Sequence, residues 1–214
     1  MNNLPLRREI IKAAQRFNST GLSASTSGNV SARTKHGFLI TPMSVEYEKL
    51  QPGSLVELDT NGKKINGRFE PSSEWRFHKD IYDKRAESRS IVHVHSPFAT
   101  AIACTRKPIP AFHYLIALAG GDSIRCAQYA TFGTQALSRN ALKALKGRSA
   151  CLLANHGQIA IGDSVASALT MAQEVEELAR HYCLSKMAGK PVLLNKNELS
   201  ENQKKIMTYR KQSD

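Results

Sequence analysis

The sequence predicts an α/β fold: a central mixed, mainly antiparallel sheet covered by helices on both sides. Amphipathic segments with helical spacing alternate with short apolar runs, and tight turns join two pairs of these runs into hairpins. Hairpins pair strands antiparallel, and helices between strands bury an apolar face against the sheet. Glycine, proline and serine mark most of the boundaries between elements.

The first part of the chain predicts one helix followed by short strands. Apolar residues recur at helical spacing over residues 5–18, and a polar loop follows. The strands are expected at Val30 and at residues 38–40, 55–58 and 65. The turn Asn61-Gly62 before the last of them is a strong hairpin signal.

The rest of the chain predicts alternating helices and strands. A helix opens near Pro71-Ser72-Ser73-Glu74 and ends near Arg85, and the serine hydroxyls are available to cap its free N–H groups. The further elements are a strand over residues 91–95, helices over 97–103 and 135–145, strands over 150–154 and 158–161, and a long helix from an Asp163 N-cap to about Gly189. The turn Asn155-His156-Gly157 makes the last two strands a second hairpin.

Length and composition predict one globular domain over residues 1–214. With 214 residues, 41% of them hydrophobic, the chain can bury a substantial core. From about residue 190 the sequence is polar, and we expect a mobile segment with a short helix and a frayed end. The four cysteines include no CxxC pair, and three lie in apolar surroundings typical of a core, so we expect neither a disulfide nor a cysteine metal site.

The charge raises the question of an anionic partner. Thirty Lys+Arg against eighteen Asp+Glu give a formal net charge of +12. The basic residues are scattered, without an aromatic-basic stripe or zinc-finger spacing, so we expect no nucleic-acid partner. No apolar run is long enough to span a bilayer and the N-terminus lacks a signal-peptide pattern, which predicts a cytoplasmic protein with no membrane partner.

Histidines supply the clearest chemical signal. His93 and His95 lie two apart in a predicted strand, so both imidazoles leave the same face. With His156 at a hairpin turn and Glu74 at a helix start, they match the N/O ligand set of a catalytic Zn²⁺ site. Glu74 is equally explained as an acid at a helix N-terminus. Spacing leaves the third ligand open: His78, four residues after Glu74, competes, and His113 is undecided.

Three hydroxyl-rich segments, residues 25–29, 41–44 and 72–73, accompany these histidines. Glycine permits close backbone approach, and N–H groups with hydroxyls at a helix start can hold a phosphate without a lysine. Ordinary loop composition is the alternative explanation, since neither a Walker A motif nor GxGxxG is present.

The order of these motifs resembles the class II aldolase and adducin family, and within it the L-fuculose-1-phosphate aldolase branch. The resemblance covers roughly residues 5–188. Its matching segments are Thr26-Ser27-Gly28-Asn29-Val30-Ser31, Leu39-Ile40-Thr41-Pro42, Tyr47-Glu48-Lys49-Leu50, Pro71-Ser72-Ser73-Glu74-Trp75-Arg76-Phe77-His78, His93-Val94-His95, His113-Tyr114, Ala119-Gly120-Gly121, Tyr129-Ala130-Thr131-Phe132-Gly133-Thr134 and Asn155-His156-Gly157. Met43 and Ile206 depart from the family's pattern.

The resemblance implies a three-layer α/β/α domain and a homotetramer with active sites at subunit interfaces. It implies one Zn²⁺ per subunit, bound by His93, His95, His156 and Glu74, with Glu74 also an acid/base and His78 structural. The catalytic tyrosines would be Tyr114, which reaches a neighbouring subunit's site, and Tyr209 on the C-terminal segment. The implied phosphate pocket consists of Ser27, Gly28, Asn29, Thr41, Ser44, Ser72 and Ser73.

The implied reaction is the reversible cleavage of a ketose 1-phosphate, L-fuculose 1-phosphate or a close analogue, to dihydroxyacetone phosphate and an aldehyde. A 5-deoxyribulose or methylthioribulose 1-phosphate aldolase would keep nearly all of these residues, and a methylthioribulose-1-phosphate dehydratase would keep the metal and phosphate sites. The ribulose-5-phosphate 4-epimerase branch is disfavoured, because it carries an aspartate in place of Glu74. A non-catalytic, adducin-like interaction protein is disfavoured because all four implied ligands are present.

Overall fold

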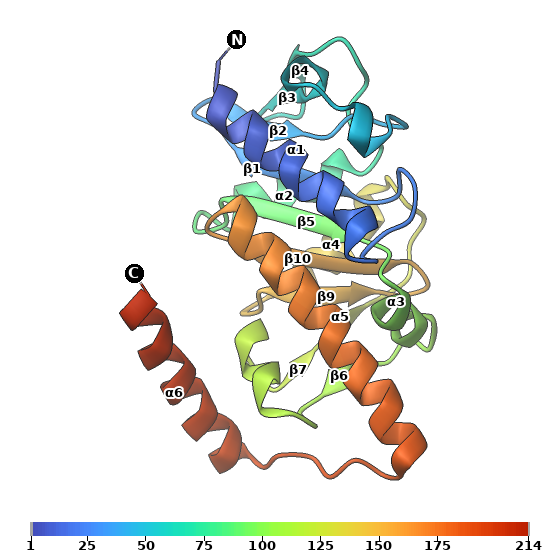
Figure 1. Cartoon of the computed structure of the whole chain (residues 1–214), viewed down its shortest axis with the longest axis vertical. Coiled ribbons are helices and arrows are strands. Elements are labelled where there is room, and N and C mark those ends of the chain that lie inside the picture. The colour runs from blue at the N-terminus through green and yellow to red at the C-terminus, as the bar shows by residue number, and fades with distance from the viewer. Residues whose placement is uncertain (1, 214) are drawn as a thin grey trace.

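The computed structural model describes residues 2–213, apart from the side chains of residues 207 and 209–213. An eight-stranded sheet, in the order β4-β3-β2-β1-β5-β10-β9-β8, lies at its centre (Figure 1). Its strands are Lys64–Asn66 (β4), Val56–Asp59 (β3), Gly37–Ile40 (β2), Asn29–Arg33 (β1), Ser90–Val94 (β5), Gly157–Gly162 (β10), Ala150–Leu153 (β9) and Cys126–Ala127 (β8). Only β8 and β9 pair parallel, so the sheet is mixed and mainly antiparallel, as the sequence predicts.

Helices cover both faces of the sheet and complete three layers (Figure 1). On one face pack α1 (Leu4–Ser19), α3 (Pro97–Cys104) and α5 (Val165–Ala188), and on the other α2 (Trp75–Lys84) and α4 (Gln135–Leu145). Strand β5 divides its side chains accordingly: Val92 and Val94 join the first core and Ile91 the second. The same alternation turns His93 toward α2, where its ring lies 5.4 Å from that of Phe77. The three-layer prediction is confirmed.

The predicted helices and strands lie close to their expected bounds, but some details differ. Helix α2 begins at Trp75 after the N-cap residue Glu74, and no side chain caps it, so the expected serine cap is wrong. The long helix α5 is capped by Ser164, whose Oγ accepts from the N–H of Ser167 at 3.1 Å, so Asp163 as N-cap is wrong by one residue. Cys151 is fully buried, because β9 lies between two core faces, and Cys126 and Cys183 are partly buried against the first core, whereas Cys104 is exposed. Three cysteines therefore lie in apolar surroundings, as expected, but only one of them is fully buried.

Residues 109–124 and the C-terminal segment form structure beside the main sheet. Strands β6 (Ile109–Pro110) and β7 (Ser123–Ile124) pair into a two-stranded sheet, and the 3₁₀ helix η3 (Tyr114–Ala119) lies between them in the chain. Helix α6 (Lys196–Ser213) packs on η3 with Leu199 buried (Figure 1). It has 18 residues, so the expectation of a short helix is wrong. Two more 3₁₀ turns, η1 (Tyr47–Lys49) and η2 (Pro52–Ser54), lie between β2 and β3. Across residues 2–213, no helix has the length and apolar character needed to cross a bilayer.

Candidate functional site

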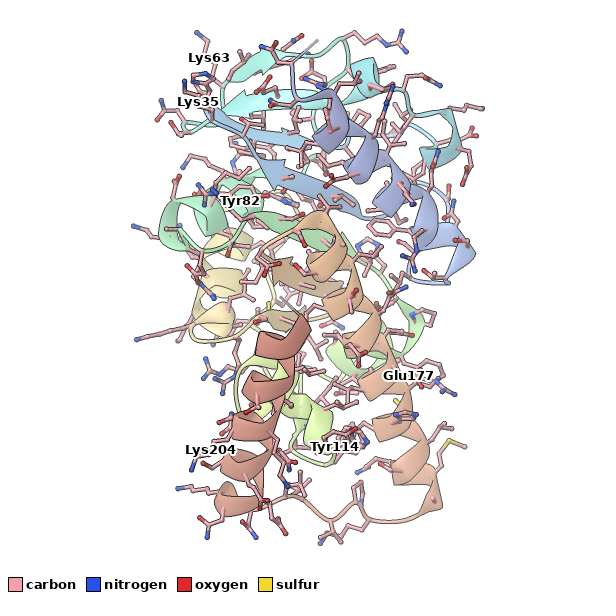
Figure 2. The ribbon with its side chains drawn as sticks, turned by 60° about the vertical axis from the view of Figure 1, so that its left-hand side comes forward. Lys35, Lys63, Tyr82, Tyr114, Glu177 and Lys204 are labelled. Carbon is pink, nitrogen blue, oxygen red and sulfur yellow. The ribbon has the colours of Figure 1, made fainter. Side chains whose placement is uncertain are left out.

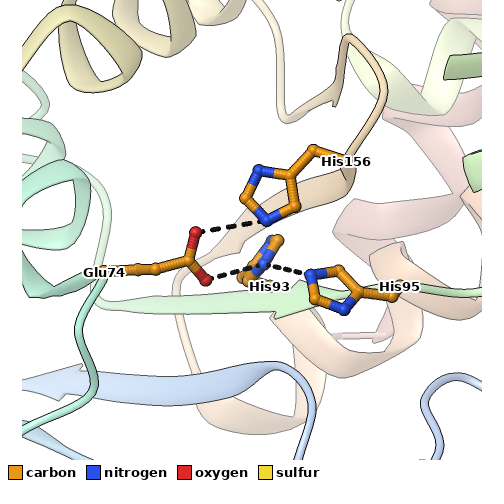
Figure 3. A group of neighbouring side chains, drawn as sticks. All are labelled: Glu74, His93, His95 and His156. Carbon is orange, nitrogen blue, oxygen red and sulfur yellow. Dashed lines mark hydrogen bonds and ion pairs between the residues drawn. The ribbon is translucent and has the colours of Figure 1, made fainter. Parts of the chain in front are cut away.

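Four side chains from three places in the fold meet at one end of the sheet. His93 lies in β5, His95 directly follows that strand, His156 lies in the β9–β10 turn, and Glu74 is the N-cap residue of α2. Their ligand atoms all lie within 4.8 Å of one another (Figure 3). In the described part of the chain, this is the group of His, Cys, Asp and Glu side chains with the geometry to hold a metal ion.

The spacing of these atoms fits one small cation. Glu74 Oε2 lies 2.9 Å from His93 Nε2, and Glu74 Oε1 lies 3.2 Å from His156 Nε2. His93 Nε2 and His95 Nε2 are 3.0 Å apart. Ligand atoms bonded to tetrahedral Zn²⁺ at about 2.0–2.1 Å stand roughly 3.3 Å from one another. These three distances are therefore close to the spacing that such an ion requires, and the remaining pairs of ligand atoms lie within 4.8 Å.

Two further features of this group favour the binding of a cation. His93 Nδ1 donates to the carbonyl of Gln158 at 2.8 Å, which leaves the Nε2 lone pair facing the other ligands. Glu74 Oε1 is buried and has no hydrogen-bond partner among the described residues. Its contact with His156 lacks hydrogen-bond geometry, and a buried carboxylate oxygen without a partner is unfavourable. A bound cation would satisfy this oxygen, so the residues present fit a metal ion.

The electrostatics favour the protonation states that bind metal. Burial and the neighbouring His93 lower the pKa of His95 to about 3 and that of His156 to about 4. Burial opposes ionisation of Glu74, but the three histidines, His93 foremost, lower its pKa to about 2. Burial also disfavours a charged His93, while contact with Glu74 raises its pKa. Neutral pH thus favours neutral imidazoles at His95 and His156 and an ionised carboxylate at Glu74, and a bound cation would favour the neutral form of His93 as well.

The turn that carries His156 is anchored to the end of α3. Asn155 has a left-handed backbone, with φ of 53°, and its N–H donates to the carbonyl of Ala103 at 3.1 Å. Its side-chain Oδ1 accepts from Arg106 Nε at 2.7 Å. A Cβ on the following Gly157 would lie 2.8 Å from His95 Cδ2, so glycine is required for the turn to approach β5. Sequence reasoning missed Asn155 as a site residue, although asparagine before His-Gly in a hairpin turn is a signal for this conformation.

A pocket of about 410 Å³ opens beside the four ligands. Its lining residues are Thr26, Ser27, Gly28, Asn29, Pro42, Met43, Ser44, Ser72, Ser73, Glu74, His95, Tyr129, Ala130, Phe132, Asn155 and His156. Six of the seven candidate phosphate residues are among them. Thr41 is not, and its Oγ1 accepts from the N–H of Val30 at 3.2 Å. Thr26 and Tyr129 line the pocket without having been singled out, although both stand in the quoted motifs.

The loop that contains Ser27 and Gly28 is held in place by a buried tyrosine and by close packing on β5. The hydroxyl of the buried Tyr47 lies 2.8 Å from the carbonyl oxygens of Ser27 and Gly28. Gly28 has φ of +93°, and a Cβ there would lie 2.6 Å from the carbonyl oxygen of His93. The loop can therefore lie directly on β5 only with glycine at this position.

The other predicted residues lie elsewhere. His78 is fully buried with both ring nitrogens hydrogen-bonded, to Asn29 Oδ1 and Ser31 Oγ, and does not join the four ligands. Tyr114 is half exposed on η3, beside α5, and does not line the pocket (Figure 2). His113 Nδ1 accepts from the N–H of Leu115 at 3.3 Å. Tyr209 belongs to α6, but its side chain lies outside the described residues.

Comparison with known proteins gives a consistent result. Residues 8–183 match the family model described as the class II aldolase and adducin N-terminal domain. The 5-methylthioribulose-1-phosphate/5-deoxyribulose-1-phosphate aldolase of Rhodospirillum rubrum is 45% identical over 208 residues, 97% of this chain and 94% of that protein. The L-fuculose phosphate aldolase of Escherichia coli O6:H1 is 44% identical over 210 residues, 98% of this chain and 97% of that protein.

A solved structure extends the similarity to the fold. An L-fuculose 1-phosphate aldolase superposes with a TM-score of 0.93 at 39% identity, covering 97% of this chain and 98% of that one. The family match, the two relatives and the shared architecture agree with the arrangement of histidines and carboxylate described above. The chain therefore belongs to the class II aldolase and adducin family, and within that family it is an enzyme of the aldolase type, a lyase.

Proposed function

We propose that this protein is a zinc-dependent aldolase that reversibly cleaves a ketose 1-phosphate, L-fuculose 1-phosphate or a close analogue, to dihydroxyacetone phosphate and an aldehyde. The observation that carries the proposal is the convergence of three imidazole nitrogens and one carboxylate within 4.8 Å, at the wall of a pocket rich in hydroxyl groups. One Zn²⁺ per subunit is the ion whose ligand preferences match this set. Such an ion supplies Lewis-acid stabilisation of the negative charge that develops on the cleaved ketose.

Glu74 moves the proton at C3 of the substrate in this proposal. Its carboxylate lines the pocket and is ionised at neutral pH, so it can accept a proton during condensation and return it after cleavage. Oε1 is the oxygen suited to this transfer once the substrate has displaced Glu74 from the ion, because Oε1 has no hydrogen-bond partner, whereas Oε2 accepts from Asn29 Nδ2 at 3.2 Å.

The phosphate group binds in the same pocket, among the hydroxyl and backbone N–H groups beside the ligands. Ser27, Gly28, Asn29, Ser44, Ser72 and Ser73 line the pocket there, and Thr41 braces the adjoining strand through its bond to Val30. Backbone N–H groups and hydroxyls hold a phosphate dianion without a lysine. Binding the non-reacting end of the substrate fixes the orientation of the reacting carbons.

The remaining catalytic groups come from a neighbouring subunit. Tyr114 is exposed and away from its own pocket, which supports a homotetramer in which it reaches the site of the next subunit and donates to the aldehyde oxygen. We assign Tyr209 the same kind of role from the C-terminal segment. We place the enzyme in the cytoplasm, where phosphorylated sugars are substrates, and we expect neither nucleic acid nor membrane as a partner.

A second candidate substrate class has its own support. The relative with 45% identity carries the name of a 5-methylthioribulose-1-phosphate/5-deoxyribulose-1-phosphate aldolase. Beside the pocket, Tyr129 and Phe132 are 54% and 64% exposed, which offers apolar surface to a methyl or methylthio group on the aldehyde. Methylthioribulose-1-phosphate dehydration is the remaining alternative on the same metal and phosphate sites.

A substrate panel tests the proposal. Zinc-loaded protein is incubated with L-fuculose, 5-deoxyribulose, methylthioribulose and ribulose 1-phosphates, and released dihydroxyacetone phosphate is measured. We expect release from at least one of them, and the ranking of kcat/KM identifies the natural aldehyde. Loss of water from methylthioribulose 1-phosphate, without release of dihydroxyacetone phosphate, would instead establish the dehydratase.

A further inference from the structure

A continuous line of buried hydrogen bonds leads away from Glu74 into the protein. Glu74 Oε2 contacts Asn29 Nδ2 at 3.2 Å, and Asn29 Oδ1 contacts His78 Nε2 at 2.5 Å. His78 Nδ1 lies 2.7 Å from Ser31 Oγ, which lies 2.7 Å from the hydroxyl of Tyr82. All five residues are at most 6% exposed. We call His78, Ser31 and Tyr82 the α2–β1 relay, because its members lie on those two elements.

The chemistry of the groups fixes the direction of every bond in this line. An ionised carboxylate only accepts, so Asn29 must present its amide N–H to Glu74 and its oxygen to His78. His78 then donates from Nε2, and its Nδ1 can only accept, so Ser31 donates to it. The serine oxygen in turn accepts from the hydroxyl of Tyr82. Each donor in the line thus points toward Glu74.

The state of His78 agrees with this direction. Burial, and less strongly the neighbouring His93, lower the pKa of His78 to about 3, so its ring carries a single proton at neutral pH. That proton lies on Nε2 as long as Ser31 donates to Nδ1. The ring of His78 therefore donates a hydrogen bond to Asn29 from Nε2 and accepts one from Ser31 at Nδ1.

The consequence for Glu74 is that its two oxygens are unequal. Asn29 Nδ2 also lies 3.0 Å from Ser72 Oγ, so the amide is engaged on both of its polar ends and cannot turn over. An inverted amide would set its oxygen against the carboxylate oxygen Oε2. Holding Asn29 in one orientation therefore fixes Oε2 and leaves Oε1, which lies 3.2 Å from His156 Nε2, as the oxygen without a hydrogen bond.

We propose that His78, Ser31 and Tyr82 are positioning residues, which act through Asn29 to hold Oε2 of Glu74 in place and keep Oε1 free of hydrogen bonds for the substrate proton. The relay never touches the substrate. This inference rests on the proposed function in one respect, namely that Glu74 transfers the substrate proton. The competing explanation is that the same cluster only fastens α2 to β1.

Tyr82→Phe separates the two explanations with the smallest change. The ring keeps its packing, and only the hydroxyl at the far end of the line is removed. We expect kcat to fall about twofold to tenfold, the equivalent of one net hydrogen bond, with KM for the ketose phosphate and zinc content unchanged. Ile81→Val is the matched control, because it removes a buried methyl group from the same helix and none of the hydrogen-bonding groups of the relay. Its kcat should equal that of the wild type.

Two results of this comparison would overturn the proposal. One is an unchanged kcat in Tyr82→Phe. The other is an equal fall of kcat in Ile81→Val at a similar loss of melting temperature, because a merely fastening role predicts that activity follows stability.

A second measurement tests the relay without any substrate. In protein labelled with ¹⁵N-histidine, long-range proton–nitrogen spectra show which ring nitrogen of His78 is protonated. We expect a neutral ring protonated on Nε2 at pH 7, and an Nδ1–H or doubly protonated ring would contradict the proposed direction. Failure of the wild type to cleave any ketose phosphate would defeat the proposed function, whereas the tautomer of His78 decides the relay separately.

Discussion

Replacing Gly157 by alanine should weaken metal binding by pushing on a ligand rather than removing one. Gly157 follows His156 and lies against the end of β5. A Cβ at this position would lie 2.5 Å from the carbonyl oxygen of Val94 and 2.8 Å from Cδ2 of His95. Both distances are below the range of real contacts, so either β5 and β10 separate locally or the ring of His95 moves.

The required movement is large on the scale of a metal site. To reach an ordinary contact of 3.4 Å from the present 2.8 Å, the ring must retreat by about 0.6 Å. Ligand distances in metal sites are kept within about 0.2 Å. We therefore expect zinc affinity to fall about tenfold to a hundredfold, the range found when groups that orient metal ligands are removed. Overpacking should also lower the free energy of unfolding by about 1–3 kcal/mol.

Gly147→Ala is the matched control. Gly147 has φ of +66° and no atom within 4 Å of a new Cβ, so alanine there strains the backbone without contacting any side chain. That strain costs about 1–2 kcal/mol. Zinc affinity is measured by competition with a chromophoric chelator, and stability by urea unfolding of the metal-free proteins. If Gly157→Ala binds zinc as tightly as Gly147→Ala, the reasoning from this contact is refuted.

Three further predictions concern the ligands, the neighbouring subunit and pH. His93→Ala should abolish zinc binding and leave the fold largely intact; full zinc occupancy by metal analysis would contradict the ligand assignment. Tyr114→Phe should lower kcat with no change in zinc content, and an unchanged kcat would remove Tyr114 from the mechanism. Metal-free protein should lose stability as the pH falls from 7 to 5. The reason is that the folded-state pKa values of His78, His95 and His156, about 3 to 4, lie below the 6.5 of an ordinary histidine. Their contribution is complete above pH 6.5 and is lost below it, by up to about 1.4 kcal/mol per pH unit for each histidine, partly opposed by the raised pKa of His93. Urea unfolding at pH 7, 6 and 5 in the presence of chelator checks this, and constant stability would contradict it.

Local sequence patterns were enough to predict most of the helices and strands and two of the four metal ligands, His93 and His95. The alternation of side chains along a strand is enough to place His93 and His95 together, and the two hairpin turns predict the β3–β4 and β9–β10 pairs. The parallel pairing of β8 with β9 has no such local signal, because it joins Cys126 and Leu152 across α4. The length of α6 was underestimated because its sequence is polar, and its burial of Leu199 against η3 is a long-range contact.

The choice between His156 and His78 shows the limit of spacing more clearly. Residues four apart share a face only inside a regular helix, and Glu74 precedes α2 with φ of −101° and ψ of 11°. Its side chain is therefore free to turn toward β5 while His78 packs into the core. His156 joins the site because strands β9 and β10 return beside β5, which is a property of the whole sheet. The resemblance to the family supplied this ligand, and spacing alone left it open.

The orientation of the Asn29 side chain is a second feature that the sequence does not predict. The hydroxyl-rich segment predicts a phosphate contact for Asn29, yet both polar ends of its side chain are engaged with Ser72, Glu74 and His78. A sequence motif names the residue but not the direction of its amide, which depends on three partners brought together by β1, α2 and the loop before α2.

The central claim is that the cluster of His93, His95, His156 and Glu74 supports metal-dependent cleavage of a ketose 1-phosphate. The most direct test measures release of dihydroxyacetone phosphate from the four 1-phosphates by wild-type protein as loaded with zinc, after chelation, and after zinc is returned. The account predicts release from at least one substrate that stops on chelation and returns with zinc. Release that is unaffected by complete removal of metal, or no release from any substrate at full zinc occupancy, would contradict it.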